Sequence, residues 1–398
     1  MQLIEIKKIF FCFLGENSDS QALPALRIAS RLVRKPIYWL APFIPIAAFL
    51  QYSGVHTPAA VKFGCAALAL IPLSALMVES TEHIAQQSGD TVSGLLNATF
   101  GNAPELIIAL IALKAGLLDV VKASIIGVIL ANLLFVLGLS LLVGGLYYRG
   151  QKFNRRGVRV ERSVLMIAAI SIVLPSVFDN FVPPEMYRHE SALNICVAVV
   201  LLVTYGLNML FMLKTHPHYY VSKQVEEILE QAAGQWPLFN ALAALLVSSV
   251  GLALLSEILV GSVEETARNL GMSKAFIGVI IIALIGGAPE TVAAVTMARK
   301  NKLDLTMGIA VGSSIQIALF VAPVLMLSSY FIAPKPLNLV VGNAGIMIVL
   351  FPVMIFSMIA ADGKSNWFKG VQLLSVYMLI ALFCFFLPDI PALPLIKP

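Results

Sequence analysis

The chain has 398 residues, of which 59% are hydrophobic and only 12% are charged. A soluble domain of ordinary composition carries roughly 25% charged residues, so this composition excludes a soluble globular protein. The formal charge of +5 would suit a nucleic-acid-binding protein only if the basic residues formed one patch.

Apolar stretches of about twenty residues recur along the chain, and each is long enough to cross the hydrocarbon core as a helix. A transmembrane β-barrel would instead need short segments of alternating hydrophobicity. We therefore predict an all-α polytopic membrane protein. Its eleven transmembrane helices are expected at residues 37–52, 59–86, 93–113, 119–147, 163–180, 192–213, 237–268, 275–297, 304–329, 337–360 and 367–388.

The polar segments between these helices predict the domain organisation. We expect a cytosolic N-terminal extension at 1–36, a peripheral first transmembrane helix with its loop at 37–58, a first five-helix repeat at 59–213, a polar, acidic cytosolic linker at 214–236, a second five-helix repeat at 237–390 and a C-terminal tail at 391–398.

The basic residues are distributed by membrane side and form no single patch. With the N-terminus in the cytosol, nineteen of the 27 Lys and Arg residues fall on the cytosolic side and eight outside. This bias follows the positive-inside rule. The expected partner is therefore the lipid bilayer, and no nucleic-acid partner is expected.

One short phrase occurs twice, as GNAPE at residues 101–105 and GGAPE at 286–290. Adding 185 to a residue number carries the first copy onto the second without a gap, and the match continues for several dozen residues. An odd number of helices in each repeat gives the two repeats opposite orientations. Inverted repeats with interrupted helices place equivalent motifs at one midplane site, an arrangement common in secondary transporters.

Each copy puts Gly, Pro and a carboxylate inside an apolar stretch. A carboxylate at membrane depth is costly and marks an ion or proton pathway. Gly and Pro weaken the helix, so we expect backbone carbonyls without helical partners, which are tolerated only where they line a cavity. Carboxylates, carbonyls, amides and hydroxyls are oxygen ligands of the kind that calcium prefers. The predicted cation ligands are Glu105, Glu290, Gly101, Asn102, Gly286, Gly287, Asn132, Ser313, Ser314 and Gln316.

Four of these residues have a structural alternative. Asn132 and Gln316 could serve as interhelical hydrogen-bonding groups, a common role for polar residues in membranes. A buried salt bridge is the alternative for Glu105 and Glu290, although no basic residue lies near them in sequence.

The two glutamates also suggest how transport is coupled. Burial and a like-charged neighbour both disfavour the ionised form of a carboxylate, so an empty site should take up protons and a divalent cation should expel them. If the empty, charged site cannot change sides, obligatory cation/proton exchange follows.

More acids lie near the ends of the long helices that precede the two motifs. An acidic vestibule that concentrates cations and relays protons is one interpretation, and acids at the membrane interface are the other. The residues concerned are Glu79, Glu82, His83, Glu257, Glu264 and Glu265. Asp119 and Asp304 follow turns at helix starts, where N-capping explains them.

These motifs resemble the calcium/proton exchanger (CAX) family of the calcium/cation antiporter superfamily. The similar segments are 94–116, 276–290 and 308–318, and the resemblance covers roughly residues 37–390. It implies an eleven-helix fold, with one peripheral helix and two inverted five-helix repeats. It also implies calcium binding at Glu105 and Glu290, with protons moving in the opposite direction. The chain departs from the family at His83, where a second acid is frequent, and at the prolines before the two glutamates.

The predicted protein is not an enzyme and needs no cofactor, since calcium is its transported substrate. A sodium/calcium exchanger of the same superfamily is the nearest alternative, and a passive divalent-cation channel is another. Small extramembrane segments favour a prokaryotic plasma membrane over a vacuolar membrane. A homo-oligomer is compatible with the sequence.

Overall fold

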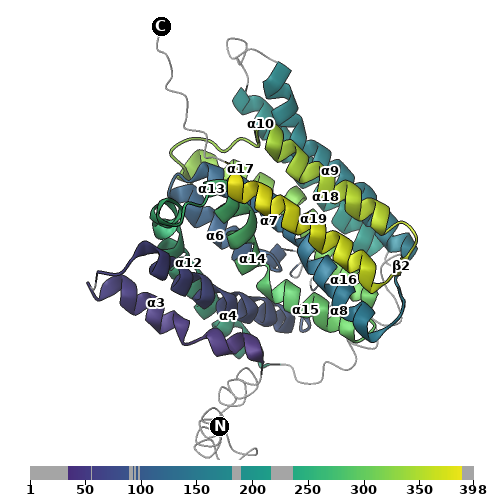
Figure 1. Ribbon diagram of the computed structural model, residues 1–398, viewed down its shortest axis with the longest axis horizontal. Coiled ribbons are helices and arrows are strands. Elements are labelled where there is room, and N and C mark those ends of the chain that lie inside the picture. Colours follow the sequence, from purple (N-terminus) through teal and green to yellow (C-terminus); the bar gives the residue numbers. More distant parts are fainter. Residues whose placement is uncertain are drawn as a thin grey trace, which may run out of the picture.

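The computed structural model describes residues 35–54, 56–88, 93, 96, 99–181, 190–216 and 236–387, and it forms a bundle of helices (Figure 1). The predicted C-terminal tail, most of the linker, and all of the predicted N-terminal extension except Lys35 and Pro36 lie outside the described residues.

The described part of the first half begins with a 3-10 turn and the short helix α3, and its long helices are α4, α9 and α10. Its elements are η1 (Pro36–Leu40), α3 (Phe43–Tyr52), α4 (Ala59–Ala85), α6 (Ala103–Lys114), α7 (Leu118–Leu130), η2 (Ala131–Val136), α8 (Leu137–Tyr147), β1 (Gln151–Lys152), α9 (Arg155–Phe181), α10 (Glu190–Leu210) and η4 (Phe211–Thr215).

The second half follows the same order of helices. Its elements are α12 (Leu238–Leu270), α13 (Lys274–Phe276), η6 (Ile277–Ile282), α14 (Ala283–Gly286), α15 (Ala288–Arg299), α16 (Leu303–Gln316), η7 (Ile317–Val321), α17 (Ala322–Ile332), α18 (Asn343–Ile359), β2 (Lys364–Ser365) and α19 (Trp367–Phe386).

Within the described residues, seven helices are long and apolar enough to cross a membrane, and the bent pair that spans Lys274–Arg299 makes eight. The stretch predicted at 37–52 consists of most of the 3-10 turn η1 and the ten-residue helix α3, and it is not among these spans. Helix α9 starts at Arg155 rather than at the predicted 163. The chain is an all-α polytopic membrane protein, while the count of eleven spans stays a prediction.

The repeat is visible in the local geometry of the helices. Both η2 and η7 are π-helical turns inside otherwise regular helices, and subtracting 185 from Ile317–Val321 gives 132–136. Such π-turns often occur at functional sites. In each half the turn lies in the helix that follows the Pro-Glu motif.

Two groups of helices form the core. Helices α4 and α12 pack along their lengths and lie beside α3, whereas α8, α16 and α19 lie on the other side of the molecule (Figure 1). Between them α7 crosses η6 at very close range. The close approach is shown at Gly127, where an added Cβ would overlap the backbone of Val279. A close crossing of this kind requires small residues.

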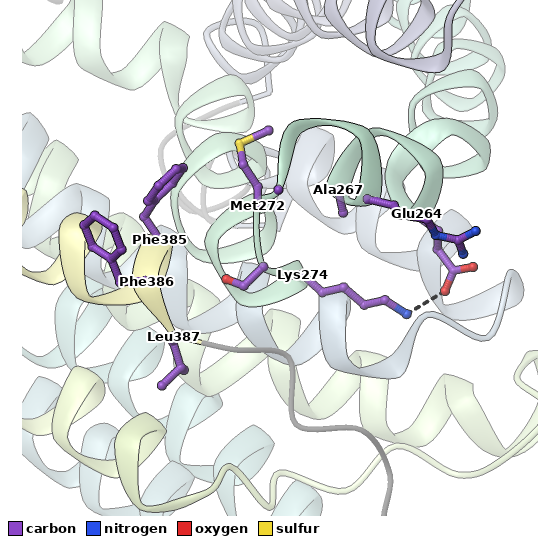
Figure 2. Close-up of a pocket in the computed structure, with 10 residues that line it drawn as sticks. Glu264, Ala267, Met272, Lys274, Phe385, Phe386 and Leu387 are labelled. Atoms are coloured by element: carbon purple, nitrogen blue, oxygen red, sulfur yellow. Dashed lines mark hydrogen bonds and ion pairs between the residues drawn. The ribbon is translucent and has the colours of Figure 1, made fainter.

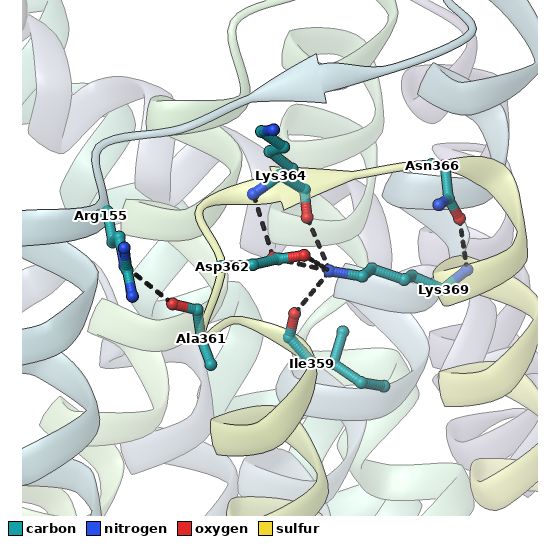
Figure 3. A network of polar contacts seen from close by, with 7 residues as sticks. All are labelled: Arg155, Ile359, Ala361, Asp362, Lys364, Asn366 and Lys369. Carbon is teal, nitrogen blue, oxygen red and sulfur yellow. Dashed lines mark hydrogen bonds and ion pairs between the residues drawn. The ribbon is translucent and has the colours of Figure 1, made fainter.

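A short two-stranded ladder joins the α8–α9 connection of the first half to the α18–α19 connection of the second half. Gln151 pairs with Ser365, and Lys152 pairs with Lys364. Beside it the ammonium of Lys369 donates to both Asp362 oxygens, at 2.7 and 2.9 Å, and to the carbonyl of Ile359 at 2.9 Å (Figure 3). The hydrogen bond from Lys369 holds the pKa of Asp362 below its usual value.

Candidate cation site

In the second half the helix breaks at the GGAPE motif. The segment Lys274–Gly286 and helix α15 meet at a bend of 59°, and Gly287 is the residue between α14 and α15. Pro289 lies in the first turn of α15, where its missing N–H costs no helical hydrogen bond. The same holds for Pro104 at the start of α6. Each proline therefore begins a helix whose first turn carries the motif glutamate.

Two of the carbonyls that the sequence predicted to be free have partners. The Asn102 carbonyl accepts from the Leu106 amide at 3.1 Å. The Gly287 carbonyl accepts from the Thr291 amide at 3.0 Å and from the Thr291 hydroxyl at 2.8 Å. For these two carbonyls the prediction was wrong, because the next helix begins without a gap after the break.

Glu105 is buried at the start of α6, with 7% of its surface exposed. Its Oε2 atom is buried and has no hydrogen-bond partner. A Cβ added to Gly286 would lie 3.1 Å from Glu105 Cγ and 3.2 Å from Oε1. The carboxylate of the first motif therefore lies against the break in the second.

Glu290 occupies the equivalent place in the first turn of α15. Its Oε2 is also buried without a partner, and the charges of Glu105 and Glu82 both lie close enough to repel its own. Among the described residues, no ion pair involves Glu105 or Glu290, so the salt-bridge alternative has no support. Two carboxylates from the two halves thus share one buried, uncompensated site.

The predicted neutral ligands differ in their hydrogen bonding, since some bond across the two halves and others bond within their own helix. Asn102 donates from its amide to Gln316 Oε1 and accepts from the Ser313 hydroxyl, which links the two halves. Gln316 therefore forms the interhelical hydrogen bond that was its structural alternative. The Ser314 hydroxyl donates to the Ala310 carbonyl at 2.9 Å within its own helix.

Asn132 differs from the other neutral residues. Its side chain is 1% exposed, and neither its amide nitrogen nor its amide oxygen has a hydrogen-bond partner. A Cβ on Gly287 would lie 3.8 Å from Asn132 Oδ1, so the amide faces the second break. Buried amides are rarely left unpaired, which favours a ligand role over interhelical hydrogen bonding for this residue.

A small cavity of about 20 Å³ adjoins Glu105, with Ser124, Gly286 and Ile317 among its lining residues. This volume accommodates one water molecule. Sequence reasoning missed Ser124, whose hydroxyl donates to the Val121 carbonyl at 2.8 Å. A single hydroxyl in an apolar helix without a repeat partner gives little signal.

The outer acids do not form one group. Glu79 accepts from Lys35 at 2.7 Å and from the Tyr38 hydroxyl at 2.9 Å, and Glu264 accepts from Lys274 at 2.6 Å. Figure 2 shows this second pair at a cavity of about 600 Å³ beside the ends of α12 and α19. These pairings favour the interface alternative for Glu79 and Glu264.

The remaining outer residues have separate surroundings. Glu82 is exposed, and its carboxylate lies close enough to Glu79 and Glu290 for like charges to repel. Its predicted pathway role stays a prediction. His83 stacks on Trp236 with ring centroids 4.7 Å apart. Glu257 and Glu265 are exposed on α12, and their predicted pathway role stays a prediction.

The N-capping explanation of Asp119 and Asp304 was wrong. The N-cap residues of α7 and α16 are Leu117 and Lys302, and neither makes a side-chain cap. Asp304 instead accepts the backbone amide of Asn154 from the other half. A tertiary contact of this kind leaves no mark in the local sequence.

The matches to known proteins cover both halves of the chain. The model of the sodium/calcium exchanger protein family matches residues 58–214 and 240–386. The chain belongs to this family. It is 41% identical over 365 residues to the Ca(2+)/H(+) antiporter of Aphanothece halophytica, which covers 89% of this chain and 97% of that protein.

Two further relatives extend the comparison. The vacuolar calcium ion transporter of Schizosaccharomyces pombe is 36% identical over 81% of this chain and 78% of its own length. The solved structure of native YfkE has a TM-score of 0.75 and 36% identity, and the match covers 89% of this chain and all of that one. This family member therefore shares its fold with YfkE over nearly its whole length.

Proposed function

We propose that this protein is a secondary active antiporter that exchanges calcium for protons across a membrane. The observation that carries the proposal is the pair Glu105 and Glu290, two carboxylates from opposite halves, each with a buried Oε2 that has no hydrogen-bond partner. Among the described residues neither forms an ion pair with a base. The relatives named as calcium/proton antiporters support the choice of cargo and counter-ion.

The charge of the site explains why exchange would be coupled. Two buried anions close together are strongly destabilised, and either two protons or one divalent cation neutralises the pair. Both loaded forms are electrically equivalent inside the protein, whereas the empty pair keeps two uncompensated charges. Alternating access through the loaded forms alone gives exchange without a leak.

The other side chains assist in this scheme. Asn132 supplies an unpaired amide oxygen beside the second break, and the pair Asn102 and Ser313 holds the helix break of one half against the other. Carboxylate and amide oxygens suit a hard cation, and the remaining positions of a six- to eight-coordinate calcium would be filled by water or hydroxyls.

The orientation and host membrane form part of the proposal. The excess of basic residues on one side supports a cytosolic N-terminus. The small extramembrane segments favour a prokaryotic plasma membrane, and the vacuolar calcium ion transporter of Schizosaccharomyces pombe keeps a vacuolar membrane as the alternative.

Uptake of labelled calcium into proteoliposomes tests the proposal. We expect uptake to require an acidic interior, to continue when sodium is replaced by an inert cation, and to disappear in Glu105→Gln and Glu290→Gln. Asp119→Asn is the matched control, since it removes an exposed carboxylate of α7. Dependence on a sodium gradient would instead assign sodium/calcium exchange, and flux indifferent to both gradients would assign a channel.

A further inference from the structure

Three segments that are far apart in the sequence come together around the β1–β2 ladder. They are residues 147–162, 298–304 and 361–369, and we call the surface that they form the basic face. The ladder joins the first segment to the third. Gln151 joins the first to the second, because it donates to the Ala298 carbonyl at 2.8 Å and to Asn301 Oδ1 at 3.0 Å. Arg155 donates to the Ala361 carbonyl at 3.0 Å (Figure 3), so the fold holds all three segments side by side.

The basic face carries eleven Lys and Arg residues but only three acids. None of the acids pairs with an exposed cation, since Glu161 is buried, Asp304 accepts a backbone amide and Asp362 is paired with Lys369. Within the part of the chain that the structure describes, six exposed cations of this face belong to no ion pair: Arg149, Lys152, Arg156, Arg159, Lys300 and Lys364. Their positive charge is therefore not offset by the described residues.

Part of this charge lies at the start of helix α9. Arg155, Arg156 and Arg159 belong to its first two turns, and its first turn contains no acid. The N-terminal end of a helix already carries a partial positive charge, so the three side chains are repelled both by the helix end and by one another. An anion that binds outside the helix would relieve both repulsions.

Exposed aromatic side chains border the basic face where two membrane spans end. The spans are Leu118–Tyr147 and Trp367–Phe386. Their ends are adjacent, because a Cβ added to Gly145 would overlap the backbone of Trp367. The exposed aromatic residues there are Tyr147, Tyr148, Trp367 and Phe368. Tyr and Trp are enriched at the boundary between hydrocarbon and water, so the cations just beyond these residues lie at the depth of the lipid headgroups.

The combination of charge and aromatic border indicates the kind of ligand. The positive-inside rule accounts for basic residues on one side of the membrane, but not for their convergence on a face without an exposed, unpaired acid. Clusters of Lys and Arg beside a membrane span attract anionic lipids, and the Arg guanidinium binds phosphate through paired hydrogen bonds. A soluble anion would satisfy the charge but would leave the aromatic border without a partner.

We propose that the basic face binds the headgroups of anionic phospholipids in preference to zwitterionic ones. The phosphate groups contact the unpaired Lys and Arg side chains, and the acyl chains contact the aromatic border. Arg299 is the last residue of α15, the helix that carries Glu290, so the bound lipid holds this helix end at the membrane surface. The binding is independent of the exchange reaction at Glu105 and Glu290.

Quenching of tryptophan fluorescence by brominated lipid tests the proposal, because Trp367 lies at the border of the basic face. Purified full-length protein in mixed micelles is titrated with phosphatidylglycerol or phosphatidylcholine, each brominated on its acyl chains. The difference between the wild type and Trp367→Phe isolates the signal of Trp367. We expect half-maximal quenching at an about fivefold lower fraction of phosphatidylglycerol than of phosphatidylcholine, and we expect high salt to reduce this preference.

Charge reversal tests whether the basic face causes the preference. Arg149→Glu with Lys364→Glu changes two exposed, unpaired residues beside the aromatic border, and it should make the two lipids equally effective. Lys114→Glu with Lys335→Glu is the matched control. These exposed lysines lie near Leu118, at the opposite end of the span from the basic face, so the control should keep the preference.

Four results would overturn the proposal. They are equal quenching by the two lipids in the wild type, a preference that survives Arg149→Glu with Lys364→Glu, a preference that the control variant also loses, and a wild-type preference that high salt leaves unchanged. The salt result needs no variant, so it still decides the question if the charge-reversed protein does not fold. Loss of the preference in sodium phosphate, but not in sodium chloride of equal ionic strength, would instead assign the basic face to a soluble anion.

Discussion

The side chain of Glu105 lies directly against the backbone of Gly286. A Cβ on Gly286 would come within 3.1 Å of Glu105 Cγ and 3.2 Å of Oε1. The carboxylate from the first motif thus fits into the helix break of the second, and a side chain at Gly286 would crowd it. The close contact with Glu105 is a better explanation for the glycine at this position than backbone flexibility alone.

Gly286→Ala should therefore reduce calcium affinity without unfolding the protein. The added methyl would force Glu105 to shift by a few tenths of an ångström. Because Glu105 is a proposed ligand, we expect the shift to weaken calcium binding by about 1.4 kcal/mol, or roughly tenfold in affinity. Calcium binding to the purified variant measures the effect. Gly308→Ala is the control, because a Cβ at that exposed position meets nothing within 4 Å. Equal affinities for the two variants would contradict the assignment of Gly286.

Asn132→Ala should separate stability from function. The unpaired amide is buried at a cost of about 1–3 kcal/mol, so its removal should leave the free energy of unfolding of the cation-free protein unchanged or slightly raised. Calcium affinity should fall, because an oxygen beside the second break is lost. Thermal unfolding in detergent, with and without calcium, compares the two effects. A destabilised variant with normal affinity would assign Asn132 a purely structural role.

Local sequence predicted the membrane class, which is confirmed, and it selected the candidate site residues for clear physical reasons, although their ligand roles stay predictions. Glu105, Glu290 and Asn132 are polar residues in apolar stretches, and the offset of 185 pairs the two glutamates. The family model and the antiporter relatives confirm the resemblance that these motifs suggested.

The features that sequence missed are tertiary. The contact of Asp304 with Asn154, the ladder of β1 with β2 and the lysine partner of Glu264 join residues that no local pattern relates. The prediction of a free carbonyl at Gly287 was wrong for a similar reason, since the amide and the hydroxyl of Thr291 both donate to it. A sequence shows where a helix breaks more reliably than what then fills the break.

The crossing of α7 and η6 predicts a large effect on stability. A Cβ on Gly127 would overlap the backbone of Val279, and one on Gly278 would meet the Val120 carbonyl at 3.1 Å. Gly127→Ala must push the two helices apart, and it should cost about 3 kcal/mol or more. We expect the unfolding midpoint in detergent to fall by about 5 °C or more. Gly206→Ala, with nothing within 4 Å of its Cβ, should leave the midpoint unchanged, and similar behaviour of the two variants would show that the crossing is not tightly packed.

The contact of Asp362 with Lys369 predicts a pH-dependent contribution to stability. The hydrogen bond from Lys369 lowers the pKa of Asp362 in the folded protein, relative to about 3.9 in an unfolded chain. The unfolded state therefore binds the proton more readily. The contribution is present in full above about pH 5 and is lost as the pH falls through the lowered pKa.

Asp362→Asn should consequently lower the unfolding midpoint at pH 7, and the difference from wild type should shrink as the pH falls below about 4. The side chain of Asp362 is 57% exposed, so the whole effect should stay within about 1 kcal/mol and weaken in high salt. Unfolding midpoints of both proteins across this pH range, at low and high salt, measure it. A difference that persists unchanged at pH 3 would show that the Asp362 carboxylate stabilises the ladder through packing and not through its charge.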